Sequence, residues 1–287
     1  MKVFQFVSAT AAYDIPATSV PHDDIVDGLR IREEWTAHSD TTLPDGVKAY
    51  RIYVEADVDS LDVVRDTWSR AHDFIDDLDR AWPYIAGEPL QPIMLTFGFG
   101  DGPIGWSTNF RELERYFAGL AGSPLGSVEV LNRHWMKLPI APLRGALAAL
   151  TRFRLLTGPA LALHELHFSS LKSTDSNAQL FLLAKCLEVV RYLLPGRDDA
   201  QRQRSLHPVV QGSLTYSLHD LIGLANTRVD IRHAVRSPRG PTMHSAMSAV
   251  ERARFIIDAN AVVRGVLCDR LEVQPIVIRP YEELSAK

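Results

Sequence analysis

Arg228 and His233 are the two residues of this sequence whose types and spacing best suit chemistry on a phosphate. Histidine titrates near neutral pH and can accept or donate a proton, whereas arginine stays charged and can bind two phosphate oxygens at once. Three more arginines follow Arg228, at Arg232, Arg236 and Arg239. Asp230 is the one acidic residue between Arg228 and Arg239. We expect Arg228 and His233 to be catalytic, the three arginines to bind phosphates, and Asp230 to support the pair.

Spacing alone does not select this pair, because five Arg and His pairs in the chain are separated by four to six residues. Two of them lie in the N-terminal half, one runs directly into Pro208, and one spans Gly240 and Pro241. The Arg228 and His233 pair differs from these because it lies on an expected long helix, 211–233, between two other helical segments. The context therefore favours this pair.

The region around the pair resembles the HEPN superfamily, whose domains are all-helical and whose ribonuclease members carry Arg, four to six residues and then His near a helix end. The segment NAQLFLLAKCLEVVRYLL looks like the first long helix of such domains, and SAVERARFIIDANAVVRGVLCDRL looks like the helix after the motif. The resemblance covers roughly residues 160–272. It implies a metal-independent endoribonuclease without a cofactor, either a toxin or a defence effector, which works as a homodimer formed through the C-terminal helices with two motifs lining one cleft.

The chemistry of such a cleft follows from RNA itself, which carries its own nucleophile in the 2′-hydroxyl group. Cleavage needs a base for that proton, an acid for the leaving 5′-oxygen, and positive charge beside the developing phosphorane. His233 and Arg228 match these roles. One departure from the family pattern bears on cleavage rather than on the fold: Val229 follows Arg228, where catalytic members usually have a polar residue.

Two alternatives to the nuclease stay open. In the first, Arg228 and Asp230 form surface ion pairs and His233 caps the last helical turn, where the helix dipole favours a cation. In the second, the domain is a non-catalytic HEPN module that binds RNA, a nucleotide or a protein partner. On one ideal helix Arg228 and His233 would lie about 140° apart, so they would converge only where the helix frays or where a second protomer contributes its own pair.

The elements that must position the pair are helices, because apolar residues recur at helical spacing from Pro142 onward. We expect helices over 142–156, 160–172, 177–194, 211–233 and 245–271, with a polar linker at 196–208. The last three should form an antiparallel bundle that buries their apolar stripes. Residues expected to be buried are Cys186, Leu187, Val190, Leu221, Ala225, Ile256 and Val263.

The N-terminal half has mixed character, with β-branched and aromatic runs that predict strands at 2–9, 47–56, 92–100 and 127–138. An amphipathic helix is expected from Leu61 to Trp82, lying on the sheet, and a shorter one over 110–120. The glycine-rich segment 98–105 lacks the residues of a nucleotide-binding loop and is interpreted as a turn between a strand and a helix. The segment His164 to His167 lacks the spacing of a zinc-binding helix.

The fold class is therefore α+β, an N-terminal mixed α/β domain followed by a C-terminal all-α HEPN-like helical bundle. We expect the first domain over 1–140, a helical connector over 141–158 and the helical domain over 159–287. Residues 1–158 carry a net charge of −7 and residues 159–287 one of +3, so an anionic partner should bind the helical part. With 46% hydrophobic residues and no long apolar run, the chain should be folded, off the membrane and cytoplasmic. The acidic domain is expected to restrain, sense or deliver the nuclease, and a regulatory protein partner would fit that role.

Overall fold

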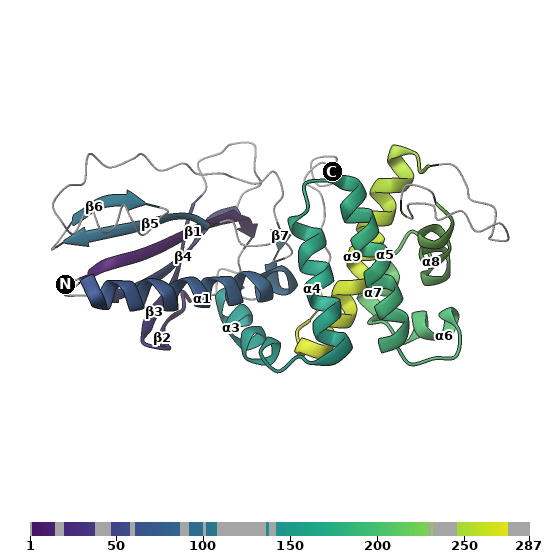
Figure 1. The fold of residues 1–287 in the computed structure, drawn as a ribbon, viewed down its shortest axis with the longest axis horizontal. Coiled ribbons are helices and arrows are strands. Elements are labelled where there is room, and N and C mark those ends of the chain that lie inside the picture. The colour runs from purple at the N-terminus through teal and green to yellow at the C-terminus, as the bar shows by residue number, and fades with distance from the viewer. Residues whose placement is uncertain are drawn as a thin grey trace. The chain divides into compact units, whose positions relative to one another are not determined.

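The computed structural model describes residues 2–14, 20–37, 47–57, 61–86, 92–99, 102–107, 136–137, 142–228, 231 and 246–274. Strands and one long helix occupy the first part of the chain and further helices the second, so the protein is α+β (Figure 1). The chain divides into two compact units. Unit 1 holds residues 1–86, 90–148 and 278–287, and unit 2 holds 87–89 and 149–277. The domain limits expected from the sequence stay a prediction.

In unit 1, the described strands form one sheet in the order β2-β3-β4-β1-β5-β6, with β7 paired to β1. Neighbours along this order are antiparallel, whereas the short strand β7 runs parallel to β1. The strands are β1 (Lys2–Asp14), β2 (Asp23–Val26), β3 (Leu29–Ala37), β4 (Val47–Asp57), β5 (Pro92–Phe99), β6 (Gly102–Ser107) and β7 (Met136–Lys137).

Three of the expected strands are confirmed, as β1, β4 and β5, and the fourth is described only at Met136–Lys137. The interpretation of 98–105 as a turn before a helix was wrong, because β6 begins at Gly102 and pairs antiparallel with β5. Strands β2 and β3 were not expected. They are joined by Asp27 and Gly28, whose φ angles of 51° and 76° suit a tight hairpin turn.

Helix α1 (Leu61–Ala86) lies along the sheet, as its apolar stripe predicts (Figure 1). Its buried face includes Ala71, Leu78 and Trp82, each at most 1% exposed, and Ile31 and Val54 of the sheet are fully buried. The expected helix at 110–120 lies outside the described residues.

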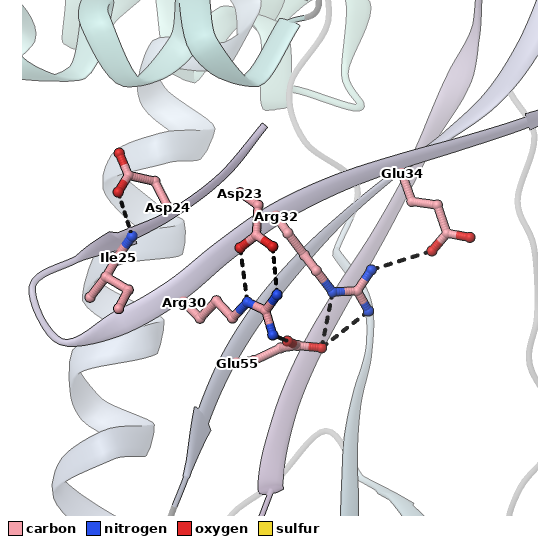
Figure 2. Close-up of polar contacts among 7 residues, drawn as sticks. All are labelled: Asp23, Asp24, Ile25, Arg30, Arg32, Glu34 and Glu55. Carbon is pink, nitrogen blue, oxygen red and sulfur yellow. Dashed lines mark hydrogen bonds and ion pairs between the residues drawn. The ribbon is translucent and has the colours of Figure 1, made fainter. Parts of the chain in front are cut away.

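Charged side chains form a ladder across β2, β3 and β4 (Figure 2). Arg32 donates to Glu55 Oε1 from Nε and Nη2, at 3.2 and 3.1 Å, and its guanidinium lies 3.8 Å from the centre of the Tyr53 ring. Arg30 donates from Nε to Asp23 at 2.8 Å, and this bond is the main reason why the pKa of Asp23 is lowered. The ladder joins strands β2, β3 and β4 through side chains as well as through the backbone.

Helix α3 (Pro142–Phe153) follows the strands along the chain. At its first turn the buried carboxylate of Glu33, from β3, accepts a hydrogen bond from the amide of Leu143 at 3.3 Å and from that of His22 at 2.9 Å. The carboxylate compensates one amide that the helix start leaves without an intrahelical acceptor. Glu33 therefore attaches the N-terminus of α3 to the sheet.

Unit 2 is helical. Its elements are α4 (Gly158–Lys172), α5 (Ser176–Leu193), α6 (Asp199–Arg204), α7 (Pro208–Ser213), α8 (Leu218–Thr227) and α9 (Ala249–Leu271). Helices α4, α5 and α9 pack against one another, and α8 packs on α5 and α9 (Figure 1). Of the seven residues expected to be buried, Ile256 is half-buried and the other six are 6% exposed or less.

Side-chain contacts give the directions of the four longer helices. Arg252, at the start of α9, donates to Ser176 and Asn177 at the start of α5, so these two helices run parallel. The end of α8 meets the start of α9 through Arg228 and Glu251, so α8 runs antiparallel to α9. A three-residue turn reverses the chain between α4 and α5. Successive helices α4, α5, α8 and α9 therefore alternate in direction, which confirms the expected antiparallel packing.

Candidate nucleic-acid interface

Helix α8 carries Arg228 at its end, and it begins much later than the sequence suggested. The expected helix 211–233 was wrong, because α7 ends at Ser213 and α8 spans only Leu218–Thr227. Ser217 and Asp220 form a capping box, in which each side chain accepts from the backbone amide of the other. The buried face of α8 consists of Leu218, Leu221, Ile222 and Ala225.

Asp258 of α9 explains the break between α7 and α8. Its carboxylate is 1% exposed and accepts hydrogen bonds from the amides of Thr215 and Tyr216, at 2.9 and 2.7 Å. Burial raises the pKa of Asp258, and these two bonds oppose the rise. The carboxylate thus compensates two backbone donors that the turn exposes, and it fixes the position of Tyr216.

Arg228 ends α8 with an extended backbone, at φ −83° and ψ 133°. Its Nη2 lies 2.7 Å from Oε1 of Glu251, and its side chain is 17% exposed against 36% for Glu251. Because the helix ends before Arg228, the 140° separation expected on one ideal helix does not apply. An ion pair of Arg228 is what the first alternative to the nuclease predicts. The same ion pair also orients the guanidinium.

The remaining predicted site residues lie outside the described residues: Asp230, Arg232, His233, Arg236 and Arg239. Of the predicted site residues, the described part of the chain therefore includes Arg228 alone. It does describe Ile231, which is fully buried and donates its amide to the Arg228 carbonyl at 3.3 Å. The chain thus returns to the core three residues after Arg228.

An open groove of about 520 Å³ runs over the outward face of α8. Its polar lining includes Arg228 at one end and Tyr216 and His219 at the other, with Asp220 and Thr227 between them. Tyr216 is half-buried and His219 is exposed. The groove therefore combines an aromatic ring, a histidine and an arginine, a set that suits a nucleotide.

His219 was not among the predicted site residues, because the spacing pattern looks for histidines after an arginine and not before it. Its Nδ1 lies 3.5 Å from Oδ2 of Asp199, a carboxylate that is 10% exposed. Asp199 also accepts from Arg191 Nε at 3.0 Å and from Arg202 Nη1 at 3.2 Å. Three basic side chains thus surround one carboxylate at the N-terminal end of α8. A second cavity, of about 210 Å³, lies between α5 and α8 and includes Arg191.

The two histidines of the 164–167 segment are buried in the bundle, and both are 0% exposed. His167 Nε2 lies 3.0 Å from Asn260 Oδ1, and the His164 ring stacks on Phe168. Among the residues that the structure describes, no group of three or more His, Cys, Asp and Glu is arranged to hold a metal ion. In that same part of the chain, no helix is both long and apolar enough to cross a membrane.

The chain was compared with family models, with curated proteins and with solved structures, and it matched none of them. The resemblance to HEPN domains therefore stays a prediction from the residues.

Proposed function

We propose that unit 2 is a metal-independent endoribonuclease of HEPN type, with Arg228 and His233 as its catalytic pair. The observation that carries the proposal is the place of Arg228, which ends α8, lines the open groove and has its guanidinium oriented by Glu251. The positive charge of this half of the chain supports an anionic substrate.

In the proposed reaction His233 removes the proton of a 2′-hydroxyl, and the 2′-oxygen attacks the adjacent phosphorus. The bond from phosphorus to the 5′-oxygen breaks, and a protonated histidine supplies a proton to that oxygen. The products are a 2′,3′-cyclic phosphate and a 5′-hydroxyl. Arg228 stabilises the phosphorane, while Arg232, Arg236 and Arg239 bind flanking phosphates.

The test is cleavage of a labelled RNA in excess EDTA, with DNA of the same sequence as the control. We expect RNA to be cut to 2′,3′-cyclic ends and DNA to stay intact. His233→Ala should slow cleavage by about 10²- to 10⁴-fold, and Arg228→Lys should restore only part of what Arg228→Ala loses, since a point charge cannot form the bidentate contact. Cleavage at full rate by His233→Ala would overturn the assignment.

The proposal includes a homodimer, because the reaction needs both a base and an acid and one motif has a single histidine. Light scattering at tens of micromolar should give twice the chain mass of 32.0 kDa. Mixing His233→Ala subunits with Arg228→Ala subunits would show whether two motifs share one cleft. Only a shared cleft predicts that the cleavage rate of the mixture differs from the sum of the rates of the two variants measured alone.

A second candidate is a non-catalytic module that binds RNA or another partner. The ion pair between Arg228 and Glu251 favours it, because an arginine whose charge is already compensated has less to offer a phosphorane. Purified protein that binds RNA but leaves it uncut, with and without added metal ions, would decide for this module.

A further inference from the structure

We propose that the outward face of α8 binds single-stranded RNA at both ends of the helix, with a base stacked on Tyr216 and phosphates contacted by His219 and Arg228. The identity of the polymer rests on the proposed function. The two contacts at the N-terminal end of α8 are new, because neither belongs to the Arg228 and His233 motif.

Tyr216 has the properties of a stacking platform. It lines the groove and is half-buried, so one part of the side chain is held and another is accessible. Its backbone is fixed by the bond to Asp258, which lies in the bundle core. An aromatic ring held in this way stacks on a base with little loss of conformational freedom.

His219 has the properties of a phosphate contact. Its side chain is 80% exposed and its Nδ1 faces Asp199, so a protonated His219 can also donate from Nε2 to a phosphate. Arg191 and Arg202 already contact the same carboxylate, so the cluster carries one more positive than negative charge even when His219 is neutral. A phosphate approaching His219 is therefore attracted rather than repelled by the cluster.

Asp220 is the acidic residue that lines the groove beside His219. Its Oδ2 accepts from the Ser217 hydroxyl at 2.6 Å and from the Ser217 amide at 3.3 Å, as part of the capping box. These bonds hold the carboxylate at the helix start, where the helix dipole partly balances its charge. The Asp220 carboxylate is thus partly balanced, and the two ends of the groove stay basic, with Arg228 at one end and the cluster around His219 at the other.

The distance along α8 favours one extended strand. His219 and Arg228 are nine residues apart, which corresponds to about 14 Å along a helix axis, so they cannot share one phosphate. They suit different phosphates of one backbone. In a duplex the bases are stacked on each other and unavailable to Tyr216, whereas a single strand can present an unstacked base.

The experiment measures binding by fluorescence anisotropy, with the full chain, EDTA and a labelled 2′-O-methyl RNA that lacks the nucleophile for cleavage. The probe is used as a single strand and as a duplex of the same sequence. We expect the single strand to bind more tightly, and Tyr216→Ala to weaken it from about fivefold to about a hundredfold. Tyr216→Phe should retain most of the affinity. Tyr192→Ala is the matched control, because Tyr192 is 78% exposed and does not line the groove.

The histidine contact has its own readout. At pH 6, His219→Ala should reduce the slope of log affinity against log salt by up to about 0.7, and Arg270→Ala, exposed on α9, should not. Equal binding of single strand and duplex, an unchanged affinity of Tyr216→Ala with native thermal unfolding, or no binding of either probe would each overturn the proposal. Cleavage of unmodified RNA is measured in a separate assay. RNA binding that depends on Tyr216, without any cleavage, would reject the proposed nuclease and support the proposed RNA-binding face of α8.

Discussion

The guanidinium of Arg228 and the carboxylate of Glu251 join the end of α8 to the start of α9, at 2.7 Å. Glu251 also belongs to the capping box of α9, in which its carboxylate accepts from the Ser248 amide and its own amide donates to the Ser248 hydroxyl. These bonds and the charge of Arg228 lower the pKa of Glu251. One carboxylate thus begins a helix and neutralises the arginine on which the proposed reaction depends.

Glu251→Gln should separate these two roles. The amide side chain keeps its length but loses the charge, so we expect a lower melting temperature and tighter RNA binding, because phosphate no longer competes with a carboxylate for Arg228. Glu272→Gln is the control, since Glu272 pairs with Arg152 at the other end of α9. Calorimetry and anisotropy measure the two effects. Weaker RNA binding by Glu251→Gln would show that the carboxylate positions Arg228 rather than competing for it.

Gly265→Ala should destabilise the bundle. A Cβ atom at this position of α9 would lie 2.8 Å from Val210 Cγ2 of α7, closer than packed carbon atoms approach. We expect a loss of about 1–3 kcal/mol in the free energy of unfolding, measured in urea. Gly223→Ala in α8 meets nothing within 4 Å and should stabilise by about 0.5–1 kcal/mol. If Val210→Ala fails to rescue Gly265→Ala, the close approach is not the cause.

Acid should destabilise the protein through His167. Burial, aided by the charge of Arg264, lowers the pKa of His167 to about 3 from a model-peptide value of 6.5. Because the unfolded chain binds this proton more readily, His167 contributes stability above pH 6.5 and loses it progressively as the pH falls toward 3, by up to about 1.4 kcal/mol per pH unit.

The measurement is urea unfolding of the wild type and of His167→Gln between pH 7 and pH 4.5. The variant is expected to show a shallower pH dependence even where its stability at pH 7 is lower. Parallel slopes for the wild type and His167→Gln would mean that this histidine is not the group responsible.

Both cysteines should resist alkylation in the folded protein. Burial raises the pKa of Cys186 to about 12 and that of Cys268 to about 11, and both side chains are 0% exposed. Thiolate is the reactive form, so iodoacetamide at pH 8 should modify neither residue until urea opens the bundle, and then both. Mass spectrometry counts the modified residues. Rapid labelling at native conditions would place at least one cysteine at the surface.

Long amphipathic elements could be predicted from the sequence, because the spacing of apolar residues identifies the buried face of a helix wherever the rest of the fold lies. This holds for α1, α4, α5 and α9. The break between α7 and α8 escaped prediction, since the carboxylate that stabilises the turn, Asp258, is more than forty residues away in the sequence. A local signal was present in the Ser217 to Asp220 spacing, which is typical of a capping box.

The hairpin of β2 and β3 also had a local signal, the Asp27-Gly28 pair between short apolar runs. It was missed because the charged residues of β3 do not resemble a strand, although Asp23 of β2 and Glu55 of β4 compensate its two arginines across the sheet. Of the candidate site, the sequence predicted Arg228 and not Tyr216 or His219. These two residues line one groove with Arg228 only because α8 presents them on its outward face, and that depends on where the helix begins.

The position of α9 in the sequence determines when this half of the chain can complete its fold during synthesis. This helix packs against α4, α5, α7 and α8, yet it follows all of them along the chain. Until the ribosome has made it, the four earlier helices have no partner for the apolar surfaces that α9 covers. A nascent chain that stops before residue 249 would therefore expose the apolar surface of an incomplete core to chaperones and to other chains. In the proposed nuclease, Glu251 would orient Arg228 only after α9 has been made, so an incomplete chain would not cleave RNA.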